Sequence, residues 1–311
     1  MYLSVVTTMY YSAPYIQEFY TRISKSAKEI TDDYEIIIVN DGSPDESLDI
    51  AVRIWYSDSK VKVIDLSRNF GHHRAMMIGL RYAKGEKIFL IDCDLEEEPE
   101  LLNLFHSVYE ANISCDVVYG VQEKRKGIWF KRLSGEIYYW ALKNITGIDF
   151  PKNVLTARLM SRRYVKSLTK HQEREIDMAG LCYITGYTQI PVPVMKYSKG
   201  STTYSIQKRI RMFINGIVSF TDRPLIGIFY TGLLICIISG AIGCHLLIRK
   251  IFLGVGLEGW TSLMASIWFL GGLVILFIGI IGIYVSKIFI ETKQRPYAVI
   301  RSIYQREGQA V

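Results

Sequence analysis

The chain has 311 residues, enough for one large domain or two modest ones, and half of them are hydrophobic. A formal charge of +7 would suit nucleic acid, an anionic membrane or phosphorylated ligands, but no nucleic-acid-binding motif accompanies it. Five cysteines without metal-ligand spacing indicate reduced thiols in a cytoplasmic setting. No basic start or apolar stretch typical of a signal peptide precedes the strand-like Leu3–Val6, so we expect the catalytic part to stay in the cytoplasm.

Short apolar runs alternate with helical patterns through the first 120 residues. After a first strand beginning at Val5-Val6, the runs predict strands over Glu35–Val39, Val61–Leu66, Lys87–Ile91 and Asp116–Tyr119. The helical patterns fall near residues 14–29, 46–57, 72–83 and 98–111. This alternation predicts an α/β fold with a mostly parallel sheet covered on both faces. Ligands bind such sheets beyond the carboxyl ends of the strands.

Two polar segments follow predicted strands at that edge. Asp41, in Asn40-Asp41-Gly42-Ser43, could accept hydrogen bonds from a nucleoside; the alternative is a turn with a helix N-cap. Ser67–His73 follows the third strand, and its Gly71 permits close approach of the backbone. The adjacent His72 and His73 lack a nearby third ligand, which favours surface or hydrogen-bonded histidines over a metal site.

The triplet Asp92-Cys93-Asp94 follows the fourth strand. Two carboxylates at i and i+2 can hold Mg²⁺ or Mn²⁺ together with phosphate oxygens, and such an ion stabilises a diphosphate leaving group. The alternative is an acidic solvated turn. Glu97–Glu100 is expected to open the next helix, with Pro99 in its first turn.

Basic side chains gather downstream of the triplet. A helix is predicted over residues 127–146, and residues 154–195 return to mixed α/β character. Arginine forks suit phosphate. A phosphate-binding role is therefore predicted for the group, although a solvated face is the alternative for each member, namely Lys124, Arg125, Lys126, Lys131, Arg132, Arg158, Arg162 and Arg163.

Two long uncharged runs, Leu225–Ile248 and Trp260–Ser286, predict a transmembrane hairpin. The first, at 24 residues, would reach roughly 36 Å as a helix, enough to cross a bilayer core. Buried core helices are the alternative. Six basic residues precede the first run and three follow the second, against two between them, which favours cytoplasmic ends. Apolar residues at helical spacing over Tyr204–Phe220 predict an interfacial amphipathic helix.

Taken together, these segments resemble the family-2 glycosyltransferases, and more closely their polyprenyl-phosphate glycosyltransferase group, which is dolichol-phosphate-mannose-synthase-like. Bacterial members of that group have a glycosyltransferase-A head and a two-helix membrane hairpin. The resemblance spans nearly the whole chain and is carried by Val5–Tyr10, Ile38–Ser43, Leu66–His72, Ile91–Glu96, Trp129–Ser134, Ala157–Arg163, Gly200–Tyr204 and the hairpin.

The resemblance implies roles for individual residues. Asp92 and Asp94 would bind the diphosphate and the metal, Mg²⁺ or Mn²⁺. Tyr10, Asp41, Asn69 and Gly71 would form the nucleotide side of the donor site. Catalytic contacts with the donor and acceptor phosphates would come from Arg125, Lys131 and Arg158.

Several positions depart from the usual pattern of that group. Thr8 stands where a proline is common, and Tyr11-Ser12 replace Asn-Glu. Gln122 replaces an arginine, and Thr156 stands where an acidic residue is usual. These changes concern base and acceptor contacts, so they bear on the identity of the nucleotide and sugar more than on the reaction type.

The expected activity is inverting transfer of a sugar from a nucleotide diphosphate, UDP before GDP, to undecaprenyl phosphate for a cell-envelope glycan. The alternatives are extension of a lipid-linked saccharide and a non-enzymatic scaffold. The expected organisation is a catalytic domain over 1–203, an interfacial helix over 204–223, two membrane helices within 224–290 and a cytoplasmic tail over 291–311. The chain is placed in the bacterial inner membrane as a multi-pass protein, with a homo-oligomer such as a tetramer as an option.

Overall fold

The computed structural model divides the chain into two compact units. It describes residues 1–122, 144–145, 153–173, 176–195, 217–218, 221–253 and 259–306. The first unit holds Met1–Leu133, Phe150–Thr203 and Arg295–Val311, and the second holds Ser134–Asp149 and Tyr204–Gln294. The C-terminal residues therefore belong to the same unit as the N-terminal ones.

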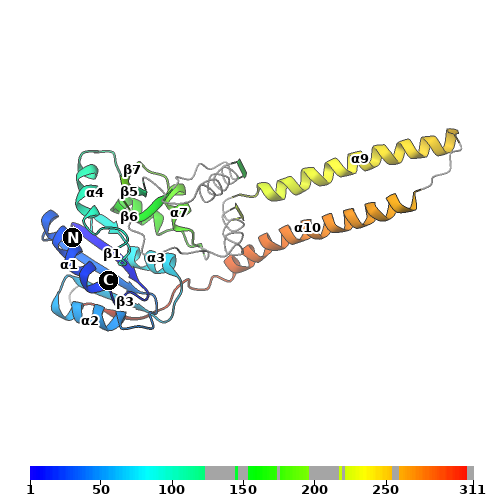
Figure 1. Cartoon of the computed structure of the whole chain (residues 1–311). Coiled ribbons are helices and arrows are strands. Elements are labelled where there is room, and N and C mark those ends of the chain that lie inside the picture. Colours follow the sequence, from blue (N-terminus) through cyan, green and yellow to red (C-terminus); the bar gives the residue numbers. More distant parts are fainter. Residues whose placement is uncertain are drawn as a thin grey trace. The chain divides into compact units, whose positions relative to one another are not determined.

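The first unit is built on an eight-stranded sheet in the order β7-β5-β6-β4-β1-β2-β3-β8 (Figure 1). Strands β4, β1, β2 and β3 run parallel, as do β5 and β7, whereas β6 and β8 are antiparallel to their neighbours. The strands are β1 (Leu3–Met9), β2 (Tyr34–Asn40), β3 (Val61–Leu66), β4 (Lys87–Leu90), β5 (Val117–Gln122), β6 (Val154–Ser161), β7 (Gln189–Val194) and β8 (Ile300–Tyr304).

Helices cover both faces of this sheet, which explains why β1, β2 and β3 are buried along their whole length. Alternate strand residues enter opposite core clusters, with Val5 and Ile36 in one and Val6 and Ile37 in the other. The first cluster packs α1 (Ile16–Ile30), α2 (Ser47–Ser57) and α4 (Leu101–Glu110), and the second packs α3 (His72–Tyr82), α6 (Arg162–Leu168) and α7 (Met178–Ile184).

The α/β architecture and the mostly parallel sheet predicted from the sequence are confirmed. The first five strands and four helices lie where the hydrophobic pattern predicted them. The helix expected from about residue 98 begins later, at Leu101. The tail after residue 290 was not expected to contain a strand, yet it contributes β8 to the edge of the sheet.

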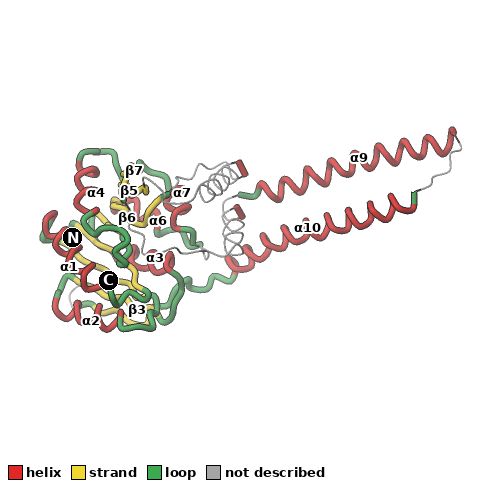
Figure 2. The backbone as a smooth tube through the Cα atoms, in the orientation of Figure 1, coloured by secondary structure: helices red, strands yellow, loops and turns green. Residues whose placement is uncertain are grey.

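The second unit contains two long helices that contact each other, α9 (Arg223–Leu253) and α10 (Trp260–Thr292), drawn in red in Figure 2. Within the described ranges, one stretch, Ser266–Thr292, is long and apolar enough to cross a membrane, and none of it is buried. The apolar part of α9, Arg223–Ser239, is shorter. Both predicted runs are thus helical, while a hairpin of two spans stays a prediction. Most of the predicted interfacial helix, and all but two residues of the one expected over 127–146, lie outside the described residues.

Candidate active site

The carboxyl ends of β4, β1, β2 and β3 meet at one edge of the sheet, because these four strands are parallel neighbours. Asp92 and Asp94 follow β4, and Tyr10 follows β1. Asp41 follows β2, and the loop Ser67–Gly71 follows β3. The fold therefore brings together all of the predicted donor-site residues that precede residue 95.

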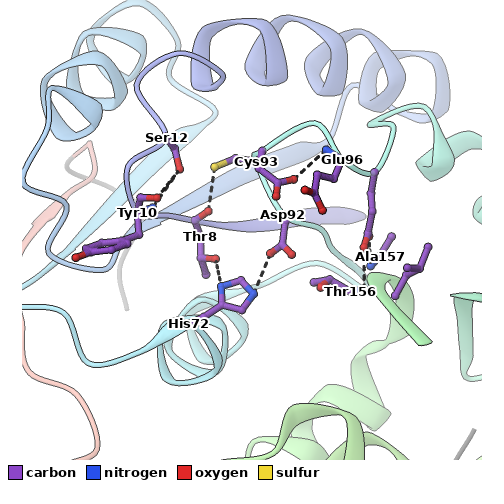
Figure 3. A network of polar contacts seen from close by, with 12 residues as sticks. Thr8, Tyr10, Ser12, His72, Asp92, Cys93, Glu96, Thr156 and Ala157 are labelled. Atoms are coloured by element: carbon purple, nitrogen blue, oxygen red, sulfur yellow. Dashed lines mark hydrogen bonds and ion pairs between the residues drawn. The ribbon is translucent and has the colours of Figure 1, made fainter. Parts of the chain in front are cut away.

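The triplet after β4 alternates its side chains between core and surface. Cys93 is buried, and its thiol donates a hydrogen bond to the Thr8 carbonyl oxygen at 3.0 Å (Figure 3). Burial raises the pKa of the Cys93 thiol to about 12, so the group stays protonated. Asp92 and Asp94 are half-buried, and Asp94 Oδ1 accepts from the Glu96 amide at 2.9 Å. The buried middle residue fixes the segment that carries the two carboxylates.

His72, the first residue of α3, connects β1 to the triplet. Its Nδ1 lies 3.0 Å from the Thr8 hydroxyl, and its Nε2 lies 3.2 Å from Asp92 Oδ1 (Figure 3). Burial alone would lower the pKa of His72, but the hydrogen bond and charge of Asp92, with the charges of Asp41 and Asp94, raise it overall. Thr8, which replaces a common proline, therefore supplies a polar partner for a histidine that orients Asp92.

Asp41 anchors the loop after β3. Its buried carboxylate accepts hydrogen bonds from the amides of Phe70 at 2.7 Å and Gly71 at 3.0 Å. Burial raises the pKa of Asp41, although the two amide donors oppose the shift. Gly42 lets the loop pass close by, because a Cβ there would lie 2.4 Å from the carbonyl carbon of Arg68. Asp41 therefore shapes this loop, and its direct contact with a nucleoside stays a prediction.

Two tyrosines form an exposed aromatic pair at the end of β1. The rings of Tyr10 and Tyr11 meet edge to face with their centroids 4.7 Å apart, and the residues are 45% and 59% exposed. Tyr11 has a φ of 53°, which is rare for a residue with a side chain. Its amide donates to the Ser43 hydroxyl at 2.8 Å, which holds this conformation beside the Asp41 turn. An aromatic surface of this kind can stack on a planar ligand.

The start of β6 is held by a buried acid. Glu97 is 1% exposed, and its carboxylate accepts from the amides of Thr156 at 3.1 Å and Ala157 at 2.6 Å. Arg158 is also buried, and it donates to the carbonyl oxygens of Leu155 at 3.0 Å and Thr156 at 3.1 Å. Arg158 therefore stabilises the beginning of β6, and its predicted contact with phosphate stays a prediction.

The donor set at the triplet consists of hard carboxylate oxygens, which suits Mg²⁺ or Mn²⁺. Within the described part of the chain, no group of three His, Cys, Asp or Glu residues is arranged to hold a metal ion. Asp92 and Asp94 would therefore supply a minority of the ligands, and diphosphate and water the rest. Arg125 and Lys131, predicted to contact phosphate, lie outside the described residues.

Sequence reasoning missed two contributors to this arrangement. Glu97 sits in a run of acidic residues expected to open a helix, and nothing in that run distinguishes the buried member. The partnership of Thr8 with His72 joins residues 64 positions apart. The only sign of this contact in the sequence is that Thr8 stands where a proline is usual.

Comparison with known proteins places these features in context. Residues 4–169 match the family described as glycosyl transferase family 2. A protein of Mycobacterium tuberculosis (strain CDC 1551 / Oshkosh) described as "Putative glycosyltransferases" is 50% identical over 98% of this chain and 89% of its own length. The bactoprenol glucosyl transferase of Shigella phage SfV is 30% identical over 98% of this chain and 100% of its own length.

A solved structure supports the architecture. Glucosyl-3-phosphoglycerate synthase from Mycobacterium tuberculosis, in complex with Mn²⁺, uridine diphosphate and phosphoglyceric acid, superposes with a TM-score of 0.52. It is 16% identical, and the match covers 71% of this chain and 78% of that one. At this identity the likeness concerns the fold, which is of the glycosyltransferase-A type.

Proposed function

Because this chain belongs to glycosyl transferase family 2, we propose that it transfers a sugar, with inversion, from a nucleotide diphosphate sugar to polyprenyl phosphate. The observation that carries the proposal is the pair Asp92 and Asp94 at the strand-end edge, in a chain that also contains the exposed apolar helix α10. Relatives matched over nearly their whole length are named bactoprenol glucosyl transferases, which supports a polyprenyl acceptor.

The donor would lie across the ends of β1, β2 and β4. Tyr10, Asn69 and Gly71 would border the nucleoside, and Asp92 and Asp94 would face the diphosphate. A divalent cation bound there would neutralise the leaving diphosphate. His72 would keep the Asp92 carboxylate oriented as the diphosphate departs, since its Nε2 lies 3.2 Å from Asp92 Oδ1. Uridine diphosphate with Mn²⁺ is the first probe to test, since the solved synthase of the same fold holds both.

The acceptor phosphate would attack the anomeric carbon from the face opposite the leaving diphosphate. A phosphate monoester has a second pKa of about 6, so it is largely ionised at neutral pH and needs little help from a general base. Thr156 in place of an acidic residue is compatible with this requirement. Positioning and charge stabilisation would then supply most of the rate acceleration.

The second unit would bring the head to its lipid substrate. Large apolar side chains of α10 point outward, with Trp268 at 77% and Ile275 at 72% exposed. A bilayer would remove this surface from water, at a gain of about 25 cal/mol for each Å². This exposure supports the proposal that α10 lies in the bacterial inner membrane, beside its polyprenyl phosphate acceptor.

The test uses full-length protein in detergent with undecaprenyl phosphate and radiolabelled UDP-glucose, UDP-N-acetylglucosamine or GDP-mannose. Chromatography of the lipid extract should reveal one labelled lipid that forms only with Mg²⁺ or Mn²⁺. Asp94→Ala should reduce its formation by at least about 100-fold, because charge stabilisation of the leaving group is lost.

Glu98→Ala is the matched control, because it removes a carboxylate four residues beyond the predicted metal pair. It should retain near-normal turnover. Near-normal turnover of Asp94→Ala would contradict the assignment of Asp94 as a metal ligand. Label appearing on a lipid-linked saccharide, with none on the lipid phosphate, would favour chain extension instead.

A further inference from the structure

The segment that follows α10 returns to the edge of the catalytic sheet. Strand β8 pairs antiparallel with β3, and Asp65 lies opposite Ser302 while Leu66 lies opposite Ile300. The register therefore skips Arg301, which is the extra residue of a β-bulge. Bulges re-aim a side chain that regular pairing would direct elsewhere.

The guanidinium of Arg301 reaches two groups at the end of β3. Its Nη2 donates to the Ser67 carbonyl oxygen at 2.7 Å, and its Nη1 lies 3.5 Å from Asp65 Oδ2. Asp65 is 2% exposed, and its other oxygen accepts from the Asn40 side chain at 2.8 Å. A buried carboxylate needs such partners, because burying an unpaired charge is costly. Arg301 is thus coupled to β2 as well as to β3.

Ser67 is held through both of its backbone groups. Its amide donates to the Val299 carbonyl oxygen at 2.9 Å, while its carbonyl accepts from Arg301. At the other end of the loop, Asp41 binds the amides of Phe70 and Gly71. The loop Ser67–Gly71 is therefore fixed at its start by the C-terminal segment and at its end by Asp41. His72, which follows directly, reaches Asp92.

We infer that Arg301 is a positioning residue for the donor site. Acting through Asp65 and Ser67, it holds the loop Ser67–Gly71 and thereby His72 in register with Asp92. The donor site would then be formed by residues that precede α9 and held in place by a residue that follows α10. Describing this loop as part of the donor site rests on the proposed function, whereas the anchoring itself does not.

Three variants of the full-length protein in detergent test the inference. Arg301→Ala removes both contacts; the side chain is 57% exposed, so its loss opens no cavity in the core, and Asp65 keeps its hydrogen bond from the Asn40 side chain. Arg301→Lys restores one charge without the planar fork. Arg306→Ala is the matched control, because this exposed arginine of the same segment donates to the Tyr56 carbonyl oxygen, away from the loop. Each variant is compared in hydrogen exchange and in donor kinetics.

In Arg301→Ala, amide exchange of the peptide covering residues 66–73 should accelerate by at least about 5-fold without added nucleotide. The KM for the nucleotide sugar should rise by about 5- to 20-fold, while kcat and the KM for the lipid acceptor change by less than about 3-fold. Arg301→Lys should recover part of both effects. Arg306→Ala should match the wild type in both measurements.

Unchanged exchange of residues 66–73 in Arg301→Ala would overturn the inference, as would equal changes in Arg306→Ala. The exchange measurement needs neither donor nor acceptor. If the wild-type protein formed no lipid-linked sugar, the proposed function would fail while exchange still decided whether Arg301 anchors the loop. If amide exchange of residues 66–73 accelerated while the KM for the nucleotide sugar stayed unaltered, Arg301 would stabilise the loop without positioning the donor site, and the inference would be refuted.

Discussion

Tyr11 combines an unfavourable backbone conformation with an exposed ring beside the predicted nucleoside site. A φ of 53° costs a residue with a Cβ on the order of 1 kcal/mol, and asparagine tolerates this region better than tyrosine does. Strain of this kind persists at functional sites, where the side chain serves a ligand. The edge-to-face contact with Tyr10 orients the ring. We therefore expect Tyr11 to lower the stability of the folded protein and to strengthen nucleotide binding.

Tyr11→Asn should raise the free energy of unfolding by about 0.5–1 kcal/mol and weaken binding of UDP with Mn²⁺ by several-fold. Denaturant unfolding and isothermal titration of full-length protein measure the two quantities. Tyr11→Phe is the control, because it keeps both the ring and the backbone strain and should alter neither. A stabilised Tyr11→Asn variant with unchanged nucleotide affinity would show that the strain serves no donor contact.

Among individual residues, the sequence predicted the acidic pair Asp92 and Asp94 but not the residues that hold this pair in place. Asp92 and Asp94 are two residues apart after a strand, so alternation alone places them together with Cys93 facing inward. Their supports come from Thr8, His72 and the distant Arg301. No periodicity in the sequence indicates which strand ends become neighbours in space. Such pairings depend on strand order and on a bulge in β8, and both are set by packing of the whole sheet.

At the scale of elements, a buried acid joins the start of strand β5 to helix α6. Asp116 is 3% exposed and accepts from Arg163 Nε at 2.5 Å, from Arg163 Nη2 at 2.7 Å and from the Ser161 hydroxyl at 2.7 Å. Burial alone would raise the pKa of Asp116, but these hydrogen bonds and the charge of Arg163 outweigh burial and lower it. The ionised form therefore stabilises the folded state.

This lowered pKa predicts a pH dependence. Stability from Asp116 should be fully present above the pKa of about 3.9 expected in the unfolded chain, and it should be lost as pH falls through the lower folded value. The deficit of Asp116→Asn relative to wild type should stay constant between about pH 5 and 7 and shrink below about pH 4. Thermal unfolding across this range measures it, with Arg163→Gln expected to behave alike. A deficit that persists undiminished at pH 3 would contradict the assignment.

The elements themselves were predictable where the hydrophobic period was strong. Strands β1 to β4 are short and almost wholly buried, β5 is buried over its first two residues, and α1 to α4 separate the five strands, so the hydrophobic pattern alone located them. Strand β8 escaped prediction because Ile300–Tyr304 is a short edge strand that pairs with a partner more than 230 residues away. Its pairing is antiparallel, which the alternating strand-helix pattern of the first 120 residues does not indicate.

At the scale of the whole molecule, the position of β8 restricts the number of times that the chain can cross a membrane. The sheet contains strands from before α9 and a strand from after α10, so both flanks of the helix pair belong to one folded unit. Both flanks must then lie on the same side of any bilayer, which requires an even number of crossings. A single crossing by α10 would separate β8 from β3. If α10 spans the membrane, a second crossing is therefore required, and we predict that α9 provides it.

Accessibility of introduced cysteines tests this topology. We predict that Gly259→Cys, between the two helices, reacts with a membrane-impermeant maleimide in intact spheroplasts, whereas Gln305→Cys, after β8, reacts only once the membrane is permeabilised. The excess of basic residues before α9 and after α10, compared with those between the two helices, predicts this orientation. Wild-type protein is the background control: Cys93, Cys115 and Cys182 are buried, and any labelling of the other two native cysteines, Cys236 and Cys244, is measured there and subtracted. Reaction of Gln305→Cys in intact spheroplasts would mean that the chain crosses an odd number of times or is inverted. Protection of both sites until permeabilisation would mean that α9 and α10 lie on one side, and the lipid phosphate would then be reached from the membrane surface.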